Sequence, residues 1–356
     1  MTDVALPTPV RPKLGGIEGL RGIAALAVLV YHAARHVDAA FGMPRLMTLF
    51  QAGHVGVDLF FVLSGFLILH VHGADIGRPT RLRHYVRQRF TRVMPLYWIA
   101  LLFTVAKLAG GGHGIPDAGH FIRSLLLLPG WQEPILGPAW SLQHELLFYL
   151  VFAVLILHRG AGLVLLGLWG VFLVCGLGGM WEGHVPFQIA GHYNLEFFMG
   201  MAVALAMPRL TRGGLLLGAG AVLLVIAGAV ESLGGLDGHG ALARLYYGVP
   251  STLVIAGLVA LSRRPGGLSL PRWLAGLGGA SYSIYLFQFL FMGLAVKLWE
   301  RAGLNGPEWA MGLFAVMIVA GLAGGLAMTR LVERPLLRLM RGRPHKNVVP
   351  PVLEPA

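Results

Sequence analysis

The 356-residue sequence is poor in charge and in cysteine, and it is rich in apolar residues. Charged residues make up only 12% of the chain, whereas hydrophobic residues make up 56%. This balance is typical of a polytopic helical membrane protein. The single cysteine, Cys175, excludes an intramolecular disulfide, and its place in an apolar run predicts a packing role.

Three further features are missing from the sequence. The polar leader, residues 1–14, runs directly into a long apolar segment, without the short apolar core and cleavage site of a signal peptide. No long extramembrane stretch is visible, and no inverted repeat of the kind that many transporters carry. The proline-containing tail at 341–356 is expected to be disordered.

Apolar segments follow one another along the rest of the chain, and most exceed the length of a soluble core helix. They lie near residues 17–37, 54–74, 93–110, 140–157, 161–180, 193–207, 214–230, 246–262, 276–299 and 310–332. The sixth of these is the shortest. We therefore predict an all-α polytopic membrane protein with about ten transmembrane helices, which form one membrane domain over 15–340 without a large soluble domain.

Basic residues are distributed unevenly between the two sides that these segments define. If the N-terminus is cytoplasmic, 21 of the 28 Lys and Arg residues fall on the inner side. The outer side then keeps Arg35, Arg45, Lys107, Arg123, Arg244, Lys297 and Arg301. The positive-inside rule predicts that both termini are cytoplasmic. Topology thus accounts for the net charge of +12, and a nucleic-acid partner is not expected.

Two ionisable residues, Arg21 and His32, interrupt the first apolar segment. Eleven residues of α-helix rise about 16 Å and complete about three turns, so the two side chains share one face near opposite membrane surfaces. Ionisable residues inside a spanning helix are costly and usually face a functional site. The alternative is that His32 only bonds a neighbouring helix and that Arg21 only extends to the interface.

Two carboxylates, Asp58 and Glu145, are expected at the depth of His32. Asp58 lies near the start of the second segment, in HVGVDLFFVLSGFLI, and Glu145 near the start of the fourth, in WSLQHELLFY. The helical rise places both about 6–7 Å below the outer surface. Ser141, one turn before Glu145, shares its face and is a candidate for substrate binding. The alternative is helix capping for Asp58 and Ser141, and contact with interfacial water for Glu145.

A cationic layer is expected on the inner side of the membrane. The stretch YVRQRFTRVMPLYW places Arg89 and Arg92 three residues apart on one helix face, with Arg87 and Arg21 at a comparable depth. Guanidinium groups pair with phosphates bidentately, so the cluster is a candidate site for a phosphorylated ligand from the cytoplasm. Arginines beside a cytoplasmic helix end are also expected from topology alone.

Six stretches, taken in order, resemble the signatures of the bacterial integral-membrane acyltransferase-3 family. They are Arg21 with ten residues to His32, GVDLFFVLSGFLI, Arg89-x-x-Arg92 before PLYW, WSLQHELLFY, SYSIYLFQ (281–288) and VERPLLRL (332–339). The resemblance covers residues 15 to about 340. It implies ten membrane helices, a cytoplasmic acyl-CoA donor and O-acylation of acceptors such as exopolysaccharide or O-antigen. It also marks His32 and the paired arginines as essential.

The sequence departs from this family at two points. Many relatives carry a histidine where this chain has Gln288, an amide that does not titrate. Many also carry an extracytoplasmic domain after the helices, whereas this chain is expected to recognise its acceptor with helices and short loops alone.

Residues and resemblance together predict one mechanism in the bacterial inner membrane. The phosphates of acyl-CoA lie against Arg21, Arg89 and Arg92, and neutral His32 removes the proton from an acceptor hydroxyl, which attacks an acyl group that we expect to be acetyl. Glu145 or Asp58 orients the imidazole. The expected partners are acyl-CoA, a carbohydrate or glycolipid acceptor and membrane lipids, with no further cofactor and no metal.

Other functions are compatible with the same residues. Buried Arg, His, Asp and Glu residues could form a proton-coupled carrier of a sugar or an acyl compound. An acyltransferase acting on a lipid or an antibiotic would differ only in its acceptor. A covalent acyl-enzyme on His32 or Ser141 is an open alternative to direct transfer.

Overall fold

The computed structural model describes residues 14–111, 114–181, 183–264, 267–268 and 271–341. Throughout these ranges the chain is helical, with short connections and no β-strand. The predicted leader and tail lie outside the described residues, except for Leu14 and Arg341.

Nine helical segments of the described chain are long and apolar enough to cross a membrane. They are Gly15–Phe41, Pro44–Asp75, Pro79–Gly110, Ala139–Leu157, Arg159–Gly178, Gly213–Ser232, Ala243–Ser262, Arg272–Arg301 and Pro307–Met340. The predicted all-α membrane fold is therefore confirmed. The sixth predicted segment is not among these nine, because its helix α9 (Asn194–Ala206) has only 13 residues. At 1.5 Å per residue this helix is shorter than the roughly 30 Å apolar core of a bilayer.

The remaining α-helices have the following bounds: α1 (Gly15–Phe41), α2 (Pro44–Phe50), α3 (Gly56–His72), α4 (Leu82–Gly110), α5 (Ala118–Leu125), α6 (Ala139–Leu157), α7 (Arg159–Cys175), α8 (Phe187–Ala190), α10 (Gly213–Ser232), α11 (Ala243–Tyr246), α12 (Gly248–Ser262), α13 (Arg272–Arg301), α14 (Ala310–Met328) and α15 (Arg334–Arg341). A 3₁₀ segment, η1 (Gln51–Val55), precedes α3. A π-helical turn, η7 (Thr329–Glu333), joins α14 to α15.

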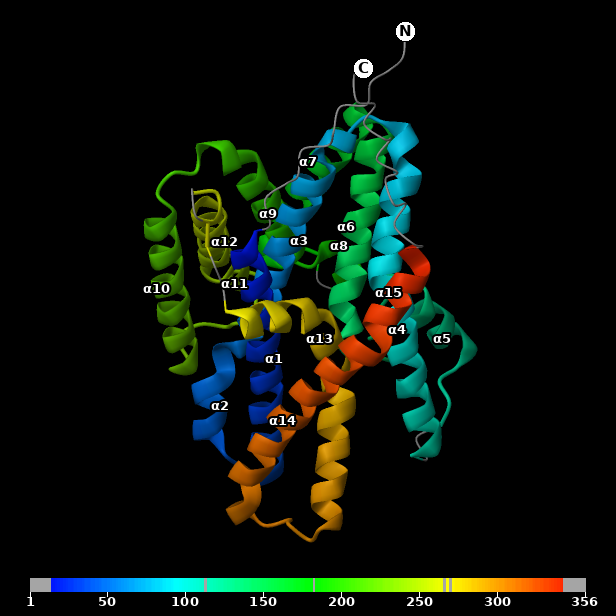
Figure 1. The fold of residues 1–356 in the computed structure, drawn as a ribbon, viewed down its shortest axis with the longest axis vertical. Helices are drawn as coiled ribbons and strands as arrows, with labels where there is room; N and C mark the ends of the chain where they lie inside the picture. The colour runs from blue at the N-terminus through cyan, green and yellow to red at the C-terminus, as the bar shows by residue number, and fades with distance from the viewer. Residues whose placement is uncertain (1–13, 112–113, 182, 265–266, 269–270, 342–356) are drawn as a thin grey trace, which may run out of the picture.

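Helix α1 occupies the centre of the bundle. It packs against α13 and α14 on one side and against α3 and α12 on the other, as Figure 1 shows. Pairs α3–α9 and α10–α12 also pack closely, and α4 lies against α6 and α15. The chain thus folds so that α1, α3, α4, α6 and α13, which carry the predicted site residues and motifs, surround one interior region.

Glycines allow α1 and α13 to approach until their backbones touch. A methyl group on Gly278 would lie 1.8 Å from the backbone oxygen of Glu18, and one on Gly22 would lie 2.8 Å from the Gly278 nitrogen. Small residues at such crossings are typical of packing between membrane helices. The close contact has a consequence for the site, because it brings Arg21 of α1 beside Ser281, one turn after Gly278.

Candidate active site

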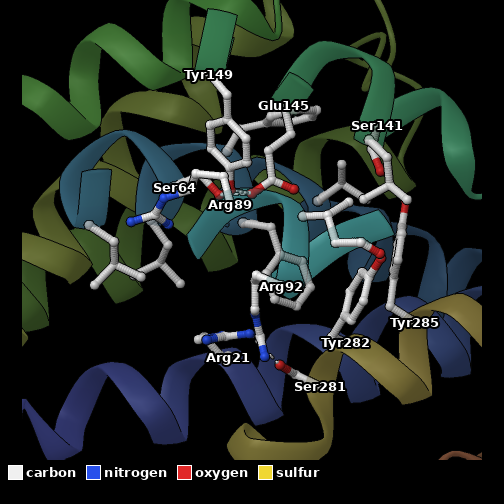
Figure 2. A pocket seen from close by; sticks show the side chains of 17 residues that line it. Arg21, Ser64, Arg89, Arg92, Ser141, Glu145, Tyr149, Ser281, Tyr282 and Tyr285 are labelled. Atoms are coloured by element: carbon white, nitrogen blue, oxygen red, sulfur yellow. Dashed lines mark hydrogen bonds between the residues drawn. The ribbon is translucent and has the colours of Figure 1, made fainter. Parts of the chain in front are cut away.

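A cavity of about 180 Å³ collects the predicted arginines. We call it the arginine cavity; Arg21 of α1 and Arg89 and Arg92 of α4 line it. Its other lining residues are Val57, Phe60, Phe61, Leu63, Ser64, Leu67, Val93, Ser141, Leu142, Glu145, Tyr149, Ser281, Tyr282 and Tyr285. Figure 2 shows Arg21, Arg92 and Ser281 together at one end, and Arg89 near Ser64 and Glu145 at the other. The structure therefore brings together three arginines that the sequence had placed at one depth.

Each of the three guanidinium groups is held in place by a different partner. Arg21 Nη2 donates a hydrogen bond of 3.1 Å to Ser281 Oγ. The Arg89 guanidinium lies 5.5 Å from the centre of the Tyr149 ring, within the range of a cation–π contact. Arg92 forms an ion pair of 3.2 Å with Glu333. These contacts restrict the arginines to orientations that face one small volume.

Glu333 is a site residue that the sequence reasoning missed. It lies at the end of the π-helical turn η7, and its second carboxylate oxygen accepts a hydrogen bond of 2.6 Å from Ser283. Single π-helical turns occur frequently at functional sites. The VERP signature contained the available clue, because it places this carboxylate two residues before Pro335, the second residue of α15.

Glu145 lies in the arginine cavity, not beside His32 as predicted. Its Oε1 accepts a hydrogen bond of 3.1 Å from Ser64 Oγ and another from the hydroxyl of Tyr149. The prediction used depth along one helix, which leaves the direction of the side chain open. The packing of α6 against α3 and α4 decides that direction. Three cations and one carboxylate thus share the cavity.

His32 lines a second and larger cavity, of about 880 Å³, which we call the His32 cavity. The imidazole is half-buried and contacts the rings of Tyr31 and Phe289, at centroid distances of 5.0 and 4.6 Å. Among the described residues, no side-chain hydrogen bond of His32 is found. Its wall combines the aromatic rings of Trp131, Trp140, Trp181, Phe187 and Tyr193 and the amides of Gln132, Gln188 and Gln288 with the charged residues Arg35 and Glu133 and the histidines His54, His192 and His239.

Asp58 does not orient His32, contrary to the prediction. Its carboxylate is fully buried and forms an ion pair with Arg244, whose Nη1 also lies 3.6 Å from Glu196. Topology had assigned Arg244 to an outer loop, but the short helix α11 turns this side chain inward, where it is 1% exposed. Asp58 therefore compensates a buried cation, which is the usual condition for a charge in a protein interior.

The arginine cavity and the His32 cavity share part of their walls. Tyr285 of α13 and Val57 of α3 line both. The Tyr285 hydroxyl is hydrogen-bonded to Ser141 Oγ at 2.8 Å, and Ser141 Oγ also donates to the backbone oxygen of Pro138. Ser141 and Glu145 do face the same cavity, as their spacing indicated. Gln288, where the family resemblance led us to expect a histidine, lines the His32 cavity and donates to the Tyr285 backbone oxygen at 3.0 Å.

The fold and the paired cavities define a polytopic membrane protein in which a cavity lined by three arginines lies next to a cavity lined by His32. A family model described as an acyltransferase domain, the acyltransferase-3 family, matches residues 14–329. The chain therefore belongs to this family of membrane acyltransferases, and the resemblance read from six sequence stretches is confirmed.

Several characterised relatives are similar to this chain. The exopolysaccharide production protein ExoZ of Rhizobium meliloti is 30% identical over 318 residues, which cover 83% of this chain and 92% of ExoZ. The acyltransferase MdmB of Streptomyces mycarofaciens is 32% identical over 39% of this chain and 38% of its own length. The peptidoglycan O-acetyltransferase OatA of Listeria monocytogenes is 29% identical over 27% of this chain and 14% of its own length. No solved structure matches the chain.

Proposed function

We propose that this protein transfers an acyl group, expected to be acetyl, from acyl-CoA to a hydroxyl group of a carbohydrate or glycolipid acceptor. One observation carries the proposal: a cavity lined by three arginines adjoins a cavity lined by an unpaired imidazole, and Tyr285 and Val57 stand between them. Such a pair of sites suits a donor that carries a phosphate group and an acceptor whose hydroxyl group is deprotonated during the reaction.

The arginine cavity is proposed to hold a phosphate group of the donor. Guanidinium groups bind phosphates bidentately and remain charged at any physiological pH. A volume of about 180 Å³ does not accommodate a whole CoA molecule. The rest of the donor would extend along the exposed start of α4, where Arg83 and Arg87 are exposed. Glu333 would keep Arg92 oriented, and Glu145 would moderate the positive charge of the cavity.

His32 is proposed to act as the general base. In this step the acceptor hydroxyl loses its proton to the imidazole, its oxygen forms a bond to the acyl carbon, and the carbon–sulfur bond of the thioester breaks. The proton then passes to the departing CoA thiolate. The free imidazole supports this role, because no described residue occupies its nitrogens. A positioned base commonly contributes about 10²–10⁴ in rate.

The acceptor is proposed to enter the His32 cavity. At about 880 Å³ this cavity lies within the range of small-molecule sites, and its wall combines aromatic rings with a few amide groups. The likeness to ExoZ over most of both chains favours an exopolysaccharide precursor over a lipid or an antibiotic. We place the protein in a bacterial cytoplasmic membrane, with the arginine cavity toward the cytoplasm.

Incubation of the purified protein with acetyl-CoA labelled in the acetyl group tests the proposal. Labelled acetyl should appear on an added oligosaccharide from the bacterial envelope, with release of one free thiol per transfer. A proton-coupled carrier would leave the thioester intact in detergent, so unchanged acetyl-CoA in the presence of acceptor would overturn the proposed reaction.

A further inference from the structure

Three side chains from separate parts of the chain meet at the edge of the His32 cavity. His54 comes from η1, Glu231 from the last turn of α10, and His239 from the connection between α10 and α11. One nitrogen or oxygen atom from each lies within 4.8 Å of the other two. His54 and Glu231 are 6% and 2% exposed, whereas His239 is exposed. The sequence predicted no metal site, because these residues are separated by up to 185 positions along the chain.

The geometry of these three residues suits a small divalent cation. His54 Nε2 lies 3.0 Å from both carboxylate oxygens of Glu231. Ligand atoms around a tetrahedral zinc ion are about 3.3 Å apart, given metal–ligand distances of about 2.0–2.1 Å. In the structure His54 and Glu231 are joined by a hydrogen bond, and a zinc ion would replace that bond with only a small increase in the separation of the two atoms. The ligand atom of His239 lies within 4.8 Å of the other two, and its side chain is exposed on a connection, so a small side-chain movement would bring it to the ion.

The surrounding residues hold the two buried ligands in place. The Tyr247 hydroxyl donates to Glu231 Oε2, and Gln51 Nε2 donates to Glu231 Oε1 at 3.2 Å. Hydrogen bonds of this kind orient metal ligands and are themselves needed for affinity. The backbone at Gly238 packs directly against both side chains, since a methyl group there would lie 2.0 Å from Glu231 Oε1 and 2.6 Å from His54 Nε2.

We propose that His54, Glu231 and His239 bind one divalent cation of the zinc type at the wall of the His32 cavity. Two imidazoles and one carboxylate form a ligand set that zinc uses in sites with a further position for water or substrate. His54 and His239 both line the cavity, so that further position faces it. An oxygen of the acceptor is the chemical group that fits there. Ion binding would also fix the 233–242 connection against η1.

Titration with Zn²⁺ alone tests the site without any acyl donor. The full chain, purified in detergent with a tag that contains no histidine and treated with a chelator, should bind about one Zn²⁺ per molecule. His239→Ala should weaken this affinity at least tenfold, since loss of even an outer-shell partner costs about 10–100-fold. Glu231→Gln should do the same. His36→Ala, which removes an exposed imidazole from α1, is the matched control and should bind as the parent does.

Two further measurements make the outcome decisive. Mg²⁺ should not displace bound Zn²⁺, because imidazole nitrogen suits zinc and poorly suits magnesium. At one Zn²⁺ concentration, the metal should raise the melting temperature of the parent more than that of His239→Ala, whose melting temperature without metal should match the parent's. No stoichiometric Zn²⁺ binding by the parent, or equal affinity in His239→Ala, would overturn the proposal. Neither result bears on acyl transfer, which the labelled-donor assay measures separately.

Discussion

The arginine cavity and the His32 cavity lie side by side but are built differently. The arginine cavity measures about 180 Å³, and Ser281, Tyr149 and Glu333 fix the orientation of its three guanidinium groups. The His32 cavity measures about 880 Å³, and its imidazole makes only ring contacts with described residues. The first cavity is small and its guanidinium groups have fixed partners, whereas the second is large, is lined by several aromatic rings and contains an imidazole without a hydrogen bond to a described residue.

This difference agrees with the proposed reaction, in which one cavity binds the donor and the other carries the general base. An anion binds more tightly to hydrogen-bond donors whose orientation is already fixed, because the entropic cost of ordering them is not added to the free energy of binding. A general base instead needs a free lone pair within reach of the acceptor's proton. Under the proposed reaction, donor and acceptor would meet at the wall that Tyr285 and Val57 form between the two cavities. The following experiments test whether the two cavities differ in sidedness, in chemistry and in affinity.

We expect the two cavities to open to opposite sides of the membrane, so that an impermeant reagent reaches only one of them in intact cells; this is the largest expected difference. In a Cys175→Ser background, Arg83→Cys marks the start of α4 and Glu133→Cys marks the rim of the His32 cavity. The positive-inside rule puts the arginine-rich side in the cytoplasm. A membrane-impermeant maleimide should therefore label Glu133→Cys in intact cells, and label Arg83→Cys only after permeabilisation. Labelling of both in intact cells would show that the cavities open to the same side.

Loss of the imidazole should abolish chemistry without affecting the donor. His32→Ala should lower kcat by at least about 100-fold, the lower range of general-base contributions, while the Kd for acetyl-CoA changes less than twofold. Labelled-acetyl transfer and CoA titration on the same preparation measure both. His36→Ala, with an exposed imidazole on the same helix, should behave as the parent. If His32→Ala loses CoA binding as severely as an arginine variant, His32 belongs to the donor site.

Loss of two guanidinium groups should affect the donor first. Arg89→Gln combined with Arg92→Gln removes charge-assisted bonds worth about 1.5–3 kcal/mol each, so CoA affinity should fall at least tenfold. The residual binding should also depend less on salt, since fewer charges are screened. Arg45→Gln, an exposed arginine on α2, is the matched control. Unchanged CoA affinity in the double variant would assign the phosphates to another part of the surface.

Substitution of Glu145 should have the smallest effect on the kinetics, but its direction distinguishes a role in the arginine cavity from a role beside His32. Glu145→Gln keeps the acceptor oxygen for Ser64 and removes a negative charge from an anion site. The KM for acyl-CoA should therefore fall by about threefold, within the range of partly exposed charge interactions, with kcat nearly unchanged. A fall in kcat of more than tenfold at constant KM would instead mean that the carboxylate acts on His32, as its depth in the helix had suggested.

Composition and apolar patterning predicted the membrane fold well. Backbone groups in a bilayer must bond within their own helix, so a long apolar segment has few alternatives to a spanning helix. The ten predicted segments correspond to helices of the structure, and the exception in length was also the shortest in the sequence, α9. Periodicity along single helices correctly grouped Arg89 with Arg92, and Ser141 with Glu145, on one cavity.

Tertiary structure decided which helices' side chains meet. Depth along a helix suggested one layer for His32, Asp58 and Glu145, but packing divided them among a cavity wall, a buried ion pair with Arg244 and the arginine cavity. Glu333 reaches Arg92 from 241 positions away, through a π-helical turn that no local pattern indicates. Sequence alone thus determined the helices, the family and the titratable residues. The pairing of those residues required the tertiary structure, because each pair depends on contacts between helices that are remote in the chain.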